Sequence, residues 1–178
     1  MAQHAGHQPS PYAGQETRAI KALSAEDIAE LIQGRGFGFA KAAELNGVPG
    51  PAHLLELKGE IGLSADQIQA IEVIFETMRR DAAALGARLI ARERDLDLSL
   101  ASGAIDERAL GALLAEIAEV TRDLRYVHLV AHLKTPPLLM PAQLAAYRSL
   151  RGYADPCATV PAGHDPAAWR RHNRCAAP

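Results

Sequence analysis

The connection "SGAID" (residues 102–106) separates two long stretches of helical apolar spacing, and this arrangement limits the possible folds more than any other feature. The first stretch opens at Ser64, which can cap a helix and exchange capping-box hydrogen bonds with Gln67. A connection this short requires the two helices to pack antiparallel. The sequence therefore predicts one helical hairpin built from residues 64–100 and 106–134.

Composition favours helices elsewhere in the chain as well. Hydrophobic residues make up 48% of the chain but aromatic residues only 4%, so alanine and leucine supply most of the apolar surface. Shorter helices are predicted to begin at Ser24, Pro51 and Pro141 and to end at Asn46-Gly47, Gly62 and Gly152. The glycines of "GRGFG" (34–38) make a weak point in the first of these helices. Since no stretch has the pattern of a strand, the predicted fold class is all-α, a long antiparallel helical hairpin with shorter flanking helices.

The same signals divide the chain into segments. The first 22 residues contain prolines and a glycine but no sustained apolar period, which predicts a flexible arm. The predicted division is a flexible N-terminal arm at 1–22, an N-terminal helical segment at 23–50, a helical domain at 51–152 and a C-terminal tail at 153–178.

Several functional classes lack support in the sequence. The formal net charge of −2 gives no electrostatic basis for nucleic-acid binding. No run of about 18 apolar residues predicts a membrane span. No glycine-rich phosphate loop follows a strand and no Ser–His–Asp grouping is suggested, so no enzymatic activity is predicted. No secretory signal is visible, and a chain that starts "MAQHAGHQ" is consistent with a mature form that carries an added Met1.

The strongest candidate site is a pair of histidines near the end of the hairpin. His128 and His132 are four residues apart, so both imidazoles face the same side of a helix. Imidazole nitrogens suit zinc, copper, nickel and cobalt. His53 and Glu56 share a face of the helix that begins at Pro51, and together the four side chains offer three nitrogens and one carboxylate. Spacing alone favours histidines that pack at a helix interface and hydrogen-bond to backbone or solvent.

Two further groups are weaker candidates. If Met1 is removed, His4 becomes the third residue after a free amine, a chelate suited to Cu(II) or Ni(II), and His7 lies close to it. Histidines in such an arm are otherwise simply solvated. Cys157 and Cys175 allow a disulfide, two free thiols or metal ligands.

Two pentapeptides carry a resemblance to a known family. "LSADQ" (63–67) and "LMPAQ" (139–143) resemble the two LTxxQ motifs of the Spy/CpxP family of bacterial periplasmic proteins. One opens the first long helix and the other opens the last helix, as in that family, and the resemblance covers about residues 51–152. The second copy departs from the motif, because Met140 stands in place of the usual threonine. The resemblance implies a periplasmic, all-α homodimer.

Within this family the pattern is closest to the metal-sensing branch typified by CnrX and ZraP. That branch has a histidine-containing helix before the first motif and a His-x-x-x-Met pair near the end of the hairpin. His53 matches the first feature, His128 matches the histidine of the second, and His132 stands where the methionine would be. Leu57 occupies the place of a second histidine in the first helix. The implied function is transition-metal sensing, buffering or resistance, with copper or zinc (alternatively nickel or cobalt) and with a membrane-bound regulator as a partner.

The chaperone members of the family imply an alternative function. They are ATP-independent and bind unfolded clients, so an exposed apolar patch without convergence of His53 on the other two histidines would favour this alternative. The oxidising envelope implied by the resemblance also favours a disulfide between Cys157 and Cys175 over the other two possibilities.

Overall fold

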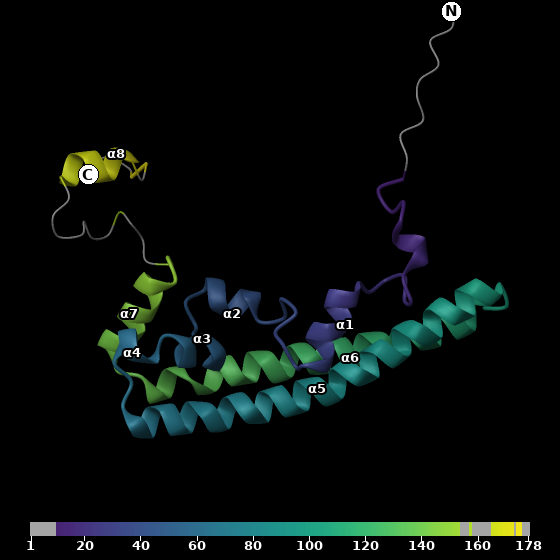
Figure 1. Cartoon of the computed structure of the whole chain (residues 1–178), viewed down its shortest axis with the longest axis horizontal. Coiled ribbons are helices and arrows are strands. Elements are labelled where there is room, and N and C mark those ends of the chain that lie inside the picture. Colours follow the sequence, from purple (N-terminus) through teal and green to yellow (C-terminus); the bar gives the residue numbers. More distant parts are fainter. Residues whose placement is uncertain (1–9, 154–156, 158–164, 173, 176–178) are drawn as a thin grey trace, which may run out of the picture. The chain divides into compact units, whose positions relative to one another are not determined.

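The computed structural model describes residues 10–153, 157, 165–172, 174 and 175. Every named element in this part of the chain is helical, which confirms the predicted all-α class (Figure 1). None of the described helices combines the length and the apolar character needed to cross a membrane. The elements are a 3-10 turn at Gln15–Thr17, α1 (Ala25–Ile32), α2 (Lys41–Leu45), α3 (Pro51–Glu56), α4 (Lys58–Ile61), α5 (Ala65–Ser102), α6 (Glu107–Lys134), a 3-10 turn at Pro136–Leu138, α7 (Pro141–Leu150) and α8 (Pro166–His172).

The chain divides into two compact units. Unit 1 contains residues 1–39 and 78–128, and unit 2 contains residues 40–77 and 129–178. Helices α5 and α6 each contribute to both units, so each unit combines segments that are far apart in the sequence. The division into four consecutive segments stays a prediction.

The predicted hairpin is present as α5 and α6 (Figure 1). Ser64 and Gln67 form the expected capping box, in which the Ser64 amide donates to Gln67 Oε1 at 2.9 Å and the Gln67 amide donates to Ser64 Oγ at 3.3 Å. Gly103 ends α5 with φ 65°, a backbone conformation that favours glycine. Asp106 then caps α6, because its Oδ1 accepts a 2.8 Å hydrogen bond from the Ala109 amide.

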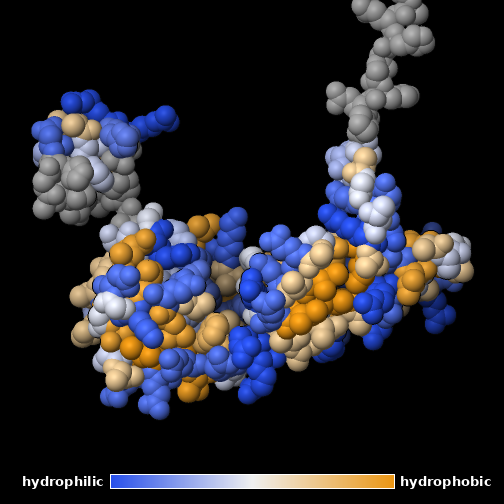
Figure 2. Space-filling view, viewed as in Figure 1, coloured by the Kyte–Doolittle hydropathy of each residue, from blue (hydrophilic) through white to orange (hydrophobic). Residues whose placement is uncertain are grey.

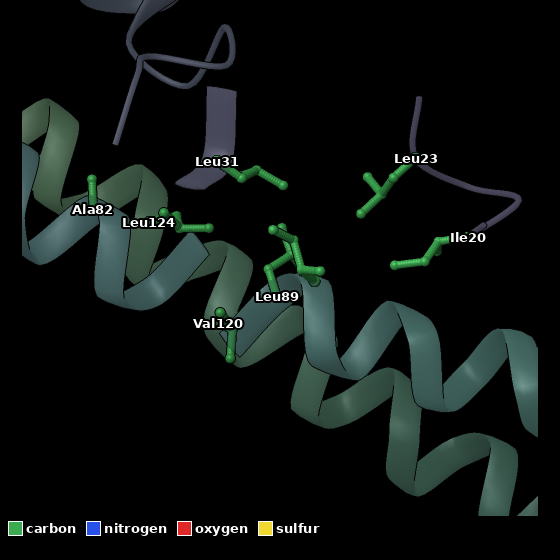
Figure 3. Packing of buried hydrophobic residues seen from close by; sticks show 8 residues of the cluster. Ile20, Leu23, Leu31, Ala82, Leu89, Val120 and Leu124 are labelled. Carbon is green, nitrogen blue, oxygen red and sulfur yellow. The ribbon is translucent and has the colours of Figure 1, made fainter. Parts of the chain in front are cut away.

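The core of unit 1 lies between α1, the segment before it, and the two long helices (Figure 3). Helix α1 begins at the predicted cap, where Ser24 and Asp27 form a capping box. Its C-terminal end crosses α5 so closely that a Cβ on Gly86 would lie 2.2 Å from the Leu31 carbonyl oxygen. The buried members of the core are Ile20, Leu23, Leu31, Ala82, Leu89, Ile90, Val120 and Leu124.

Two expectations about the N-terminal part of the chain need correction. Ile20, predicted to lie in a flexible arm, is 1% exposed because it packs in the unit 1 core. The segment "GRGFG" ends a helix instead of weakening one: α1 stops at Ile32, and α2 is a separate helix. Gly34 and Phe37 both have positive φ values, 66° and 43°, which do not occur in a right-handed helix.

Unit 2 has a smaller core around the short helices. Leu54 on α3, Ile61 on α4, Ile71 on α5 and Tyr147 on α7 are buried together. Helices α3, α4 and α7 are each too short to be stable alone, so the apolar contacts that they share with α5 hold them in place.

Candidate functional site

His132 packs against and hydrogen-bonds to the connection between α2 and α3. Its Nδ1 lies 2.8 Å from the Val48 carbonyl oxygen, and since a carbonyl can only accept, Nδ1 carries the proton. Its ring lies against Gly50, where a Cβ would come within 2.5 Å of Nε2. One turn further along the chain, Thr135 Oγ1 donates to the Pro49 carbonyl at 2.5 Å. His132 is 7% exposed, so it packs at this interface as its spacing alone favoured.

His53 lies beside a buried carboxylate that the sequence analysis missed. Its Nδ1 is 3.3 Å from Oε1 of Glu44, a residue of α2. The same oxygen accepts hydrogen bonds from the Tyr147 hydroxyl at 2.5 Å and from Arg151 Nε at 2.9 Å. Four side chains from three short segments of unit 2 thus meet at one carboxylate oxygen.

The electrostatics of this cluster favour an ionised Glu44. Burial raises the pKa of Glu44. The hydrogen bond from Tyr147 and the charges of His53 and Arg151 together lower it by more, so the pKa of Glu44 lies below its usual value. Burial, followed by the bond to the carboxylate, raises the pKa of Tyr147 well above its usual value. Tyr147 is thus a permanent donor to Glu44 near neutral pH.

His128 and Glu56 lie in different surroundings. His128 is 2% exposed in unit 1, where its ring stacks on Phe39 with a centroid separation of 6.0 Å and an interplanar angle of 20°. Glu56 is exposed at the end of α3. His4 and His7 lie outside the described residues.

The described residues do not fit a preformed metal site. A structural or catalytic transition-metal site needs at least three converging protein ligands, and no group of three or more His, Cys, Asp or Glu residues in the described part of the chain is placed to hold an ion. The proton and the carbonyl partner on Nδ1 of His132 also remove one of its two nitrogens as a ligand. The four-ligand site His53, Glu56, His128 and His132 stays a prediction.

The glutamines of the two pentapeptides meet in unit 2. Gln67 Nε2 donates to Gln143 Oε1 at 2.8 Å, and Gln143 Nε2 donates to Gln67 Oε1 at 2.9 Å. Each Oε1 also accepts from the amide that begins its own helix, at Ser64 and Met140, both at 2.9 Å. The second amide hydrogens go to the carbonyl oxygens of Leu138 and Gly62. Both side-chain amides are therefore fully satisfied, and the pair joins the starts of α5 and α7.

The outer part of the hairpin in unit 1 has an unusual surface. We define the hairpin end as residues 91–119, in which no residue is buried. Leu98, Leu100 and Leu114 are 61%, 56% and 47% exposed, and Figure 2 shows hydrophobic residues on the surface at this end. The large aliphatic residues of the hairpin end are Leu96, Leu98, Leu100, Ile105, Leu110, Leu113, Leu114 and Ile117.

The hairpin end is also acidic. It contains seven carboxylates and three guanidinium groups, a formal net charge of −4. Arg92 is already engaged by Asp95 at 3.0 Å and by Glu116 at 3.2 Å. Partial burial raises the pKa of Glu93 above its usual value. A ligand for this surface should therefore be apolar and should carry positive charge.

The C-terminal tail contains the disulfide between Cys157 and Cys175, with an S–S distance of 1.99 Å. It encloses α8, whose first turn is capped by Asp165 Oδ1, which accepts from the Ala168 amide at 2.7 Å. Metal ligation by these two cysteines is incompatible with this bond, because thiolates are the ligating form.

Comparisons of the chain with models of protein families, with curated proteins and with solved structures found no match. The resemblance of "LSADQ" and "LMPAQ" to the LTxxQ motifs therefore stays a prediction.

Proposed function

We propose that this chain is an ATP-independent chaperone-type protein whose hairpin end captures apolar, positively charged segments of unfolded polypeptides. The observation that carries the proposal is the hairpin end itself, in which eight large aliphatic residues share 29 positions without one buried residue. Fully burying a leucine side chain stabilises a complex by roughly 1.5–3 kcal/mol. Exposed apolar residues that gather on one surface mark binding sites in soluble proteins.

The charge of the hairpin end supports one class of occupant over another. A second copy of the chain would bring the same net charge of −4 to the same surface, so repulsion opposes self-association through it. A homodimer, which the family resemblance implies, would then use a different surface. An unfolded client that carries lysine or arginine beside apolar residues complements both properties of the hairpin end.

The proposal includes a location in an oxidising compartment, the bacterial periplasm. A disulfide is typical of oxidising environments such as the bacterial periplasm. Metal sensing, buffering or resistance is the weaker proposal, because His132 is occupied by Val48 and Gly50 and no three ligands converge in the described residues.

The test replaces exposed leucines by glutamine, a polar residue with good helix propensity. The variant carries Leu98→Gln, Leu100→Gln and Leu114→Gln. Suppression of aggregation is measured with a reduced, unfolded basic client (lysozyme) and with an acidic one (α-lactalbumin). The parent should protect the basic client better, and the variant should need at least about tenfold more protein for equal protection, since three half-exposed leucines no longer contribute.

A matched control removes equally exposed apolar residues from other surfaces. Val73→Gln, Leu133→Gln and Leu150→Gln alter residues that are also 48–67% exposed but lie outside the hairpin end. This control should protect the client as the parent does. Equal protection by both triple variants, or better protection of the acidic client, would contradict the proposal.

A further inference from the structure

Helix α8 has its acidic group at the N-terminal end and its basic groups at the C-terminal end. The only carboxylate among residues 165–172, 174 and 175 is Asp165, and it caps the N-terminal end. Arg170 and Arg171 lie in the last turn, and Arg174 stands two positions after the end of the helix. The C-terminal end of α8 therefore carries three exposed guanidinium groups, and Figure 2 shows hydrophilic side chains over most of this helix.

Backbone hydrogen bonds hold Arg174 against the last turn of α8. Arg174 has φ 55°, and its amide donates to the Arg171 carbonyl at 3.3 Å, so the chain turns back at this point. The Cys175 amide donates to the Arg170 carbonyl at 3.0 Å, and the disulfide to Cys157 fixes Cys175 in turn. In the described part of the chain none of the three arginines forms a salt bridge with a carboxylate.

Trp169 adds an amphipathic ring to the same helix. It is partly exposed, it precedes Arg170 directly, and it is the only tryptophan in the chain. Tryptophan is enriched at the interface between membrane and water, where the ring lies among lipid headgroups. Neighbouring arginines at that depth contact lipid phosphates bidentately.

We propose that Trp169 and the three arginines at the C-terminal end of α8 bind the surface of an anionic phospholipid bilayer. This surface is separate from the hairpin end and does not depend on the proposed chaperone function. Near an anionic bilayer each arginine increases partitioning about fivefold, so three arginines together contribute about 100-fold. Nucleic acid offers the same phosphate chemistry, but the tryptophan beside the arginines and the disulfide of an oxidising compartment favour lipid.

The full-length oxidised chain is tested with vesicles of phosphatidylcholine alone and of phosphatidylcholine with about 30% phosphatidylglycerol. The fluorescence of Trp169 reports on this segment alone, because the chain has no other tryptophan. We expect a blue shift and co-sedimentation with the anionic vesicles, both reversed by about 0.5 M salt. Neutral vesicles should leave the spectrum unchanged.

Two triple variants with the same change of charge separate this segment from the rest of the chain. Arg170→Gln, Arg171→Gln and Arg174→Gln should lower partitioning about 100-fold. The control with Arg80→Gln, Arg88→Gln and Arg125→Gln, which alters exposed arginines of unit 1, should bind as the parent does. Circular dichroism checks that both variants keep their helices.

Three outcomes would overturn the proposal. They are absence of binding to anionic vesicles, equal loss of binding in the two triple variants, and a stronger response of Trp169 to duplex DNA or inorganic phosphate than to anionic vesicles. The variant Trp169→Phe gives a second measurement, since it keeps every charge but should weaken co-sedimentation, and an unchanged partition would exclude insertion of the ring.

Discussion

Glu44 is the residue whose surroundings differ most from what its sequence context indicates. It lies in a five-residue helix of the sequence "KAAEL", where a glutamate looks like part of a solvated face. Its carboxylate nevertheless joins Tyr147, Arg151 and His53. Those partners follow it by 103, 107 and 9 positions in the chain, so no local pattern could have revealed the cluster.

The lowered pKa of Glu44 predicts a stability that depends on pH. In the unfolded chain this group protonates near 4.5, whereas in the folded protein it keeps its charge to lower pH. The stabilisation is therefore complete above about pH 4.5 and is lost as the pH falls through the folded pKa. Glu44→Gln should lower the free energy of unfolding by about 1–2 kcal/mol at pH 7, with a smaller difference below pH 4.5, measured by urea denaturation. The exposed Glu60→Gln is the control, and a difference for Glu44→Gln that stays constant with pH would refute this account.

At the scale of elements, the starts of the predicted helices were predicted well because capping and proline signals are local. Ser24, Ser64 and Pro141 each begin a helix as expected. The close crossing of α1 over α5 was not predictable in the same way. A glycine within a long helix has no local signal that distinguishes a close contact from an open surface, and Gly86 and Gly111 look alike in the sequence.

These two glycines form a matched pair for testing the crossing. A Cβ at position 86 would lie 2.2 Å from the Leu31 carbonyl oxygen, whereas a Cβ at position 111 meets nothing within 4 Å. Gly86→Ala should lower the free energy of unfolding by about 1–3 kcal/mol, since backbone must shift. Gly111→Ala should raise it by about 0.5–1 kcal/mol through helix propensity. Chemical denaturation checks both, and equal effects of the two substitutions would show that α1 does not cross α5 at this point.

At the scale of the whole molecule, burial is distributed unevenly along the two long helices. Apolar periodicity predicted the hairpin correctly but gave the same weight to leucines near residue 90 and near residue 110. Only the leucines near residue 90 pack against a third element besides the two long helices, which is formed by α1 and by Ile20. The candidate metal site stays a prediction for a related reason, because one helix face can place two histidines together but the spacing does not indicate where a third ligand lies.

This uneven burial predicts a gradient of local stability within unit 1. Amide hydrogens of residues 91–119 should exchange at least about tenfold faster than those of residues 82–90 and 120–127, because opening the hairpin end exposes little buried surface. Hydrogen exchange read by mass spectrometry gives the measurement. A bound unfolded client should slow exchange at the hairpin end alone, and uniform protection along both helices would contradict the gradient.

The reciprocal pair formed by Gln67 and Gln143 has a consequence for how this sequence can vary over time. Each amide completes the other's hydrogen bonds while it accepts from the first amide of its own helix. A change at one position leaves an unmet donor or acceptor at the other, at the start of a different helix. Substitutions at the two glutamines are therefore expected to covary. Among descendants of this chain, the two glutamines should be kept together or lost together, even where the residues between them diverge.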